Sequence, residues 1–327
     1  MTDRRVVLYA ALTLIALPAA IVPIEAVAFH SANRENGSFI SSGEKREYVL
    51  YVPKSYDRSK PTPLVISMHG AGLWGAAQRD VSRWNALADS KGFIVVYPSG
   101  VGGNGVRIWR AEPGDGLRKD VRFISDLIDT LSATYNIDST RTYANGLSNG
   151  GGMSFALSCA LSNRIAAVGL VAAAETLPWS WCMREAGGER REGRGERREA
   201  GGERREAERP VPVISFHGTA DPVVPYNGGA SWISPRPFPS VPRWSANWAQ
   251  RNRCVGKPVE SRVSGDVTRV EYTGCAGNAS VVLYTIQGGG HTWPGGKALP
   301  EWFVGRTAQS IDATSLMWAF FTAHPRG

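Results

Sequence analysis

Tyr143-Ala-Asn-Gly-Leu-Ser-Asn-Gly-Gly-Gly-Met153 joins a strand-like run to a helix-compatible run through a glycine-rich turn. Residues 146–150 within it read Gly-x-Ser-x-Gly, with Ser148 at the centre. Glycines on both sides of a serine allow the strained turn that lifts a hydroxyl group clear of a sheet. Many glycine-rich turns contain a serine, so the pattern gains meaning only from its context. Between a strand and a helix, it predicts a nucleophile.

Apolar runs alternate with helix-like runs on both sides of this stretch. Continuous apolar runs, typical of strands buried on both faces of a sheet, lie at 63–68, 93–97, 165–173 and 211–216. Residues 45–53 alternate and stop at a proline, which favours a strand near a sheet edge. Two later strands are expected at 267–272 and 281–286, and helices over 76–90, 120–135, 241–253 and 308–322. The alternation predicts an α/β fold, with a mostly parallel sheet covered by helices on both faces.

Residues 1–28 have the pattern of a signal peptide. A basic start precedes an almost wholly apolar run, and Ala-Val-Ala at 26–28 fits a small-x-small cleavage site. The alternative is an uncleaved membrane anchor, which Pro18 and Pro23 disfavour. No later apolar run approaches the roughly 20 residues that span a bilayer. We therefore expect a secreted protein, extracellular or periplasmic, with a single catalytic domain over 29–327 and no membrane association after cleavage.

Four cysteines follow the expected signal peptide, and export permits them to form disulfides. Four cysteines allow three pairings, of which sequence proximity favours Cys159–Cys182 and Cys254–Cys275. A metal cluster is the alternative, but the chain has no CxxC, HExxH or other close ligand spacing. Structural disulfides are expected, and no metal.

A low-complexity insertion rich in Glu, Arg and Gly occupies about 184–209. The heptapeptide Glu-Ala-Gly-Gly-Glu-Arg-Arg begins at 185 and recurs at 192, with changes, and at 199. The repeat has no large apolar residue, which excludes a coiled-coil seam. Its composition predicts a solvated insertion that is dispensable for activity. The net charge of +8 includes this nearly neutral segment, and no nucleic-acid partner is expected.

Residues 100–105 match Gly-x-Gly-x-x-Gly after a strand, and Asp120 lies twenty residues beyond Gly100. A dinucleotide site requires such glycines to open a helix. Here they continue into a run that reaches a proline at 113, so the dinucleotide interpretation is disfavoured and no cofactor is expected. The segment instead predicts a loop near the substrate, with Trp109 in its wall.

Three residues that follow expected strands form a candidate catalytic set. Ser148, Asp221 and His291 occur in the order nucleophile, acid, histidine that α/β-hydrolases use. An imidazole takes the proton of a serine hydroxyl, and a buried carboxylate orients the imidazole and stabilises its charged form. Because the carboxyl ends of parallel strands meet at one sheet edge, we expect the three to converge there. His217 is a rival base, but its position at a strand end assigns it a structural role.

The same geometry predicts where an oxyanion would bind. The residue after the nucleophile, Asn149, supplies one backbone N–H, and the loop after the strand ending at Met68 supplies another. Ala71 is the expected second donor, with Gly70 as the alternative.

Four segments carry these residues. They are Pro63-Leu-Val-Ile-Ser-Met-His-Gly-Ala-Gly72, Gly146-Leu-Ser-Asn-Gly-Gly151, His217-Gly-Thr-Ala-Asp-Pro-Val-Val-Pro-Tyr226 and Gly288-Gly-Gly-His-Thr-Trp-Pro-Gly295. Together they resemble the secreted esterase family of polyhydroxybutyrate depolymerases, feruloyl esterases and related acetyl xylan esterases. The resemblance covers about 44–321 and implies an α/β-hydrolase fold and metal-free hydrolysis through an acyl-enzyme. The Glu/Arg/Gly insertion departs from the family pattern.

The expected function is hydrolysis of small, oligomeric or polymeric carboxylic esters by a secreted serine esterase. The chain stops after its last expected helix without the polymer-binding module that depolymerases commonly carry. This favours feruloyl or acetyl esters of plant polysaccharide over hydroxybutyrate polymer. Trp293 and Trp302 are further candidates for an aromatic wall beside Trp109. An acyltransferase on the same fold and a catalytically inactive binding protein are the alternatives.

Overall fold

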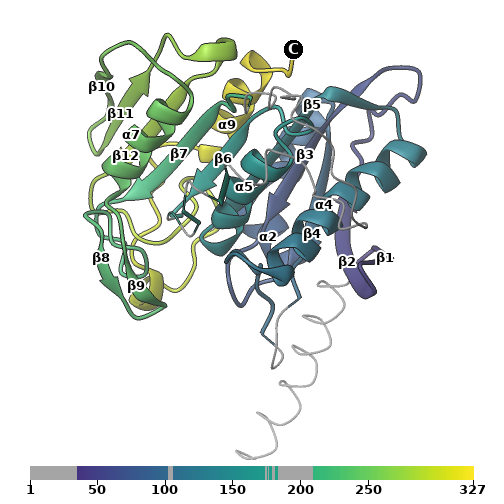
Figure 1. Cartoon of the computed structure of the whole chain (residues 1–327), viewed down its shortest axis with the longest axis horizontal. Helices are drawn as coiled ribbons and strands as arrows, with labels where there is room; N and C mark the ends of the chain where they lie inside the picture. Colours follow the sequence, from purple (N-terminus) through teal and green to yellow (C-terminus); the bar gives the residue numbers. More distant parts are fainter. Residues whose placement is uncertain (1–34, 102–105, 174, 176, 179–180, 183–208) are drawn as a thin grey trace, which may run out of the picture.

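The computed structural model describes residues 35–101, 106–173, 175, 177–178, 181–182 and 209–327, so the expected signal peptide and the repeat lie outside the described residues. A ten-stranded sheet forms the centre (Figure 1). Its strand order is β1 (Gly37–Ser41), β2 (Glu44–Tyr51), β4 (Ile94–Ser99), β3 (Thr62–Met68), β5 (Ile137–Leu147), β6 (Val168–Val171), β7 (Val213–Gly218), β12 (Val281–Ile286), β11 (Val267–Tyr272) and β10 (Val259–Ser264). The strands from β4 to β12 in this order are parallel, and antiparallel strands complete both edges. The predicted mostly parallel sheet is confirmed.

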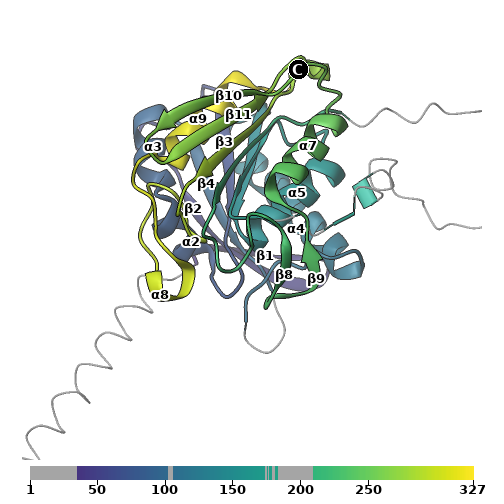
Figure 2. The same ribbon diagram turned by 90° about the vertical axis from the view of Figure 1, so that its left-hand side faces the viewer.

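Helices cover both faces of the sheet (Figure 2). One face carries α4 (Asp115–Thr134), α5 (Asn149–Ala160) and α7 (Val241–Arg251), and the other carries α2 (Gly75–Ser82), α3 (Trp84–Lys91) and α9 (Ala313–Ala323). Within β3, Leu64 and Ile66 pack into the first layer, whereas Val65 packs into the second. Both faces of the central strands are therefore buried, which explains their continuous apolar sequences. None of the helices among the described residues has the length and apolarity needed to cross a bilayer.

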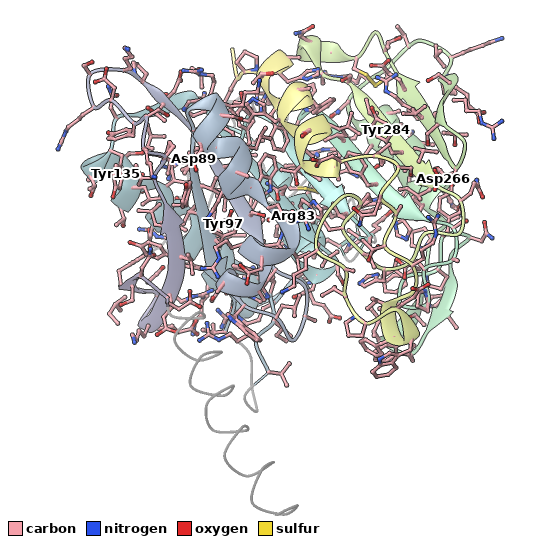
Figure 3. The ribbon with its side chains drawn as sticks, turned by 180° about the vertical axis from the view of Figure 1, so that it is seen from behind. Arg83, Asp89, Tyr97, Tyr135, Asp266 and Tyr284 are labelled. Atoms are coloured by element: carbon pink, nitrogen blue, oxygen red, sulfur yellow. A yellow bond between two sulfur atoms is a disulfide. The ribbon has the colours of Figure 1, made fainter. Side chains whose placement is uncertain are left out.

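Three predicted helix boundaries differ for local reasons. The helix expected over 76–90 is two helices, because Arg83, which is labelled in Figure 3, has a left-handed backbone (φ 58°) between α2 and α3. The helix expected from 120 begins at Asp115. The last helix begins at Ala313 and not at 308, since the carboxylate of Asp312 accepts hydrogen bonds from two N–H groups of its first turn.

Several short elements were not predicted. They are the edge strands β1 and β10, the hairpin of β8 (Gly229–Ser231) and β9 (Ser234–Phe238), and the four-residue helix α8 (Glu301–Val304). They are short and largely exposed, so their sequences lack a sustained apolar period.

Two disulfides link Cys159 with Cys182 and Cys254 with Cys275. These are the pairs that sequence proximity favoured. The first joins the C-terminal end of α5 to the segment that follows β6, and the second joins the residues after α7 to those after β11.

A buried ion cluster fixes the loop that precedes α4. Arg46 on β2 and Asp120 on α4 are fully buried, and Nη1 of Arg46 lies 2.8 Å from Oδ1 of Asp120. The same carboxylate accepts hydrogen bonds from the backbone N–H of Arg110 (2.8 Å) and from its guanidinium. Arg110 also donates two hydrogen bonds to Glu44, which lower the pKa of that carboxyl to about 2. Asp120 therefore orders the loop that carries Arg110.

We expect Asp120→Asn to lower the free energy of unfolding by about 3 kcal/mol, because it leaves the buried charge of Arg46 with only its longer ion pair to Glu44, at 3.3 Å. Urea denaturation measures this loss. Asp115→Asn is the matched control, since its ion pair with Arg118 is exposed and should contribute little. Equal losses in the two variants would contradict the assignment.

Candidate active site

Ser148 occupies a strained turn between β5 and α5. Its backbone has φ 54° and ψ −117°, outside the regions that non-glycine residues ordinarily adopt. A hydrogen bond from its N–H to the carbonyl of Val171 (2.8 Å) fixes the turn to β6. A Cβ atom at Gly146 would collide with the backbone of Gly150, and one at Gly150 would collide with the carbonyl of Met68. The two glycines of the motif are thus required by close backbone packing.

Asp221 and His291 form a hydrogen-bonded pair, although 70 residues separate them in the chain. Asp221 follows β7 and His291 follows β12, which are adjacent parallel strands, so the two loops lie at the same sheet edge. Nδ1 of His291 lies 2.8 Å from Oδ2 of Asp221. The backbone N–H of His291 donates to the carbonyl of Val304, which holds this loop against α8. The carboxylate can thereby keep the proton on Nδ1 and leave Nε2 of His291 free to act as a base.

The Asp221 carboxylate is buried and extensively hydrogen-bonded. Its Oδ1 accepts hydrogen bonds from the backbone N–H groups of Val223 and Val224, both 2.8 Å long. Burial acts to raise the pKa of Asp221, but hydrogen bonds from His217 and His291 outweigh burial and hold the pKa well below its ordinary value. Asp221 is therefore a carboxylate at neutral pH.

Ser148 and His291 line one pocket of about 980 Å³. Its walls come from the loop after β3, from the β8–β9 hairpin, and from residues 108–114, 116–117, 175, 177–178, 299–300 and 303–304. Figure 2 shows α8 and the β8–β9 hairpin at the same end of the molecule. A pocket of this size accommodates a ligand of drug-like size.

The expected oxyanion donors border the same pocket. Gly70, Ala71 and Asn149 all belong to its lining. Asn149 is the first residue of α5, where a helix leaves N–H groups without intrahelical acceptors. Ala71 lies in a turn closed by a hydrogen bond from the N–H of Leu73 to the carbonyl of Gly70, and its own N–H has no acceptor within the described part of the chain. Both N–H groups are therefore available to a ligand oxygen.

His69 holds the loop that carries Ala71. The side chain is fully buried, with Nδ1 2.7 Å from the carbonyl of Gly70 and Nε2 2.9 Å from the backbone nitrogen of Gly100. Nε2 must accept from that N–H, so the proton of the neutral ring sits on Nδ1 and donates to Gly70. Burial lowers the pKa of His69 to about 4, against the hydrogen bond to Gly70 that acts to raise it.

The three tryptophans proposed as an aromatic wall lie in different places. Trp109 borders the pocket but is almost wholly buried, and its indole N–H donates to the carbonyl of His69. Trp293 is fully buried, donates to Thr314 and is not among the pocket-lining residues, so the expectation of a substrate contact does not hold for it. Trp302 is 88% exposed on α8.

Asn149 has a side-chain role that the sequence did not indicate. Its Oδ1 accepts from the backbone N–H of Trp109 (2.6 Å), and its Nδ2 donates to the carbonyl of Trp109 (3.0 Å). This pair of hydrogen bonds fixes one pocket wall directly to the residue after Ser148. The spacing of 40 residues gives no local signal for such a contact.

The depressed pKa of His69 predicts a loss of stability in mild acid. Below the unfolded pKa of about 6.5, the unfolded chain takes up a proton that the folded protein accepts only near pH 4. The free energy of unfolding should therefore fall by about 3 kcal/mol through this group between pH 6.5 and pH 4.

Urea denaturation at pH 7 and pH 4.5 measures this loss. His69→Asn should lose less stability over the interval than the wild type, because asparagine does not titrate. His324→Asn, at a partly buried position near the C-terminus, should behave as the wild type does. Equal pH dependence in the wild type and His69→Asn would contradict the expectation.

Comparison with known proteins agrees with this architecture. Residues 46–177 match the family described as Esterase PHB depolymerase. The chain is 30% identical to feruloyl esterase B of Piromyces equi over 77% of its own length, and it spans 44% of that protein. It is 27% identical to a probable feruloyl esterase C of Aspergillus terreus, over 85% of this chain and 84% of that one.

Among solved structures, the acetyl xylan esterase from Aspergillus awamori superposes with a TM-score of 0.56 at 13% identity, covering 85% of this chain and 94% of that one. This likeness concerns the fold alone. Residues 46–177 thus belong to the Esterase PHB depolymerase family, the chain is similar to feruloyl esterases over most of its length, and its fold is that of the α/β-hydrolases.

Proposed function

We propose that this protein is a secreted serine esterase that hydrolyses carboxylic esters through an acyl-enzyme. The observation that carries the proposal is the buried Asp221–His291 pair in the pocket that Ser148 lines. The relatives named as feruloyl esterases support ester hydrolysis. The two disulfides support an oxidising compartment, as does the signal-like sequence of residues 1–28.

In the proposed reaction, Nε2 of His291 takes the proton of the Ser148 hydroxyl while Oγ attacks the ester carbonyl. The backbone N–H groups of Asn149 and Ala71 stabilise the oxyanion that forms. The proton then passes from His291 to the departing alcohol, and the acyl group stays on Ser148. A water molecule, deprotonated by His291, hydrolyses the acyl-enzyme, and the proton returns to Ser148 as the acid leaves.

The mouth of the pocket carries exposed aromatic side chains. Trp232 and Phe303 line the mouth with ring centroids 5.9 Å apart, and Trp302 contacts Phe303 at 5.7 Å. Trp232 is 68% exposed and Trp302 is 88% exposed, so the rings are open to a ligand. We call these three residues the aromatic rim. The rim supports an ester with one part beyond the pocket, such as an acyl group on a polysaccharide whose sugar rings stack on indole faces.

Ser148→Ala should reduce kcat at least about a thousandfold, because no other hydroxyl occupies the turn. Hydrolysis of p-nitrophenyl acetate and methyl ferulate measures the loss, and the melting temperature verifies the fold. Ser154→Ala is the matched control on α5, since its hydroxyl donates to the carbonyl of Gly150 and does not line the pocket. Full activity in Ser148→Ala would end the proposal.

The wild-type protein also separates the two alternatives. Labelling of Ser148 by a fluorophosphonate excludes an inactive binding protein. Hydrolysis that persists when an alcohol acceptor is added, without dominant transfer of the acyl group to that alcohol, excludes an acyltransferase.

Trp302→Ala should raise KM for acetylated xylan roughly fivefold while kinetics on p-nitrophenyl acetate stay unchanged, because stacking on one ring contributes about 1 kcal/mol. Trp302→Phe keeps an aromatic ring and should retain most of the affinity. An unchanged KM for xylan in Trp302→Ala, with weaker action on hydroxybutyrate polymer, would assign the rim to a polyester substrate instead.

A further inference from the structure

Two histidines contact the carboxylate of Asp221. Nδ1 of His291 lies 2.8 Å from Oδ2, and Nε2 of His217 lies 3.3 Å from the same oxygen. His217 is the penultimate residue of β7, four residues before Asp221, and its side chain is almost wholly buried. The proposed reaction uses only His291.

The surroundings of His217 determine which nitrogen carries its proton. Besides Asp221, Nε2 of His217 faces the carbonyl of Val224 at 2.9 Å. Both neighbours are hydrogen-bond acceptors, so Nε2 must carry a hydrogen and donate to them. His217 is therefore a donor to Asp221 and cannot act through Nε2 as a base.

We propose that His217 is a positioning residue, whose Nε2–H contact with Oδ2 of Asp221 competes with His291 and limits how strongly that carboxylate stabilises the protonated form of His291. The inference rests on the proposed role of His291 as the base. It assigns to His217 an effect on the catalytic histidine beyond the structural role that the sequence indicates.

The physical reason is that one carboxylate oxygen serves two donors. Part of the negative charge of Oδ2 is stabilised by His217, which leaves less to stabilise the charged form of His291. Without His217, the whole interaction would fall to His291, and its protonated form would become more stable. A larger share of the enzyme would then carry protonated His291, which cannot act as a base, near pH 6.

Few other titratable groups face this pair. The ring of Tyr226 lies 6.1 Å from that of His217, and its hydroxyl contacts Thr285 on β12. On its α7 side, His217 borders Trp244, Ser245 and Trp248, none of which titrates near neutral pH.

Charged residues also line the pocket that His291 borders. Arg110, Glu112 and Glu175 belong to the same lining. All three residues are unchanged in the variants that test the proposal. A difference caused by a substitution at position 217 can therefore be attributed to the lost imidazole.

The test replaces the donor at position 217 and follows the pH dependence. His217→Phe keeps a ring but removes the N–H, and should move the acid limb of kcat/KM upward by about one half to one pH unit. The ratio of kcat/KM at pH 6 to that at pH 8 should therefore fall roughly three- to tenfold. His217→Gln places an amide N–H at a similar reach and should restore most of the wild-type profile.

A second measurement needs no turnover. In the Ser148→Ala protein, nitrogen-15 NMR of the histidine rings reports the titration of His291, whose signals are identified by their loss in His291→Gln. Adding His217→Phe should raise that titration by the same half to one unit. If the phenylalanine variant does not fold, His217→Met removes the donor with a flexible apolar side chain and carries the same expectation.

An unchanged titration of His291 in the folded Phe or Met variant would overturn the proposal. Equal shifts in the Gln and Phe variants would also overturn it, because they would show that shape and not the N–H matters. The two hypotheses fail separately: a wild-type protein that hydrolyses no ester removes the proposed function, whereas the NMR titration still decides whether His217 acts on His291.

Discussion

The strained backbone of Ser148, with φ 54° and ψ −117°, is the constraint on which the rest of the site depends. Such a conformation costs a residue with a Cβ atom roughly 1–3 kcal/mol, so it persists only where its surroundings enforce it. Here the hydrogen bond to Val171 fixes the turn from one side, and α5 begins on the other. The absence of Cβ atoms at Gly146 and Gly150 lets the loop after β3 approach within contact of the turn. One packing arrangement therefore determines the positions of the Ser148 hydroxyl, the Asn149 N–H and the loop that carries Ala71.

The parallel sheet then determines which other side chains reach this turn. Strands β5, β6, β7 and β12 are neighbours, and the loops that follow β7 and β12 carry Asp221 and His291. Because both faces of these strands are buried in apolar layers, their ends cannot shift independently. The carboxylate of Asp221 is desolvated in this setting, and it stays ionised only because four groups donate hydrogen bonds to it. Rigid strands and a fully bonded carboxylate together give the imidazole of His291 one orientation.

The features that were predictable from sequence are those with a local signal. Continuous apolar runs indicated the central strands, and the glycine pattern around Ser148 indicated the turn, since both follow from neighbours in the chain. Long-range contacts gave no such signal. Asn149 bonds to Trp109 across 40 residues, and Asp120 pairs with Arg46 across 74, so neither role was visible in a spacing. Trp293 shows the reverse error: it was a candidate for an aromatic wall around the substrate, whereas its side chain turns into the core to reach Thr314. The split at Arg83 was missed because arginine seldom adopts a left-handed backbone.

The disulfide between Cys159 and Cys182 connects the helix that follows Ser148 to a segment that borders the pocket. Helix α5 presents Ser148 at its start and Cys159 near its end, while Cys182 closes a segment whose Leu177 and Pro178 border the pocket. Cleavage of this bond would release one pocket wall from the helix, and the Asp221–His291 pair would keep its own hydrogen bonds. Thiol reductants are therefore expected to change the shape of the pocket before they disturb the Asp221–His291 pair.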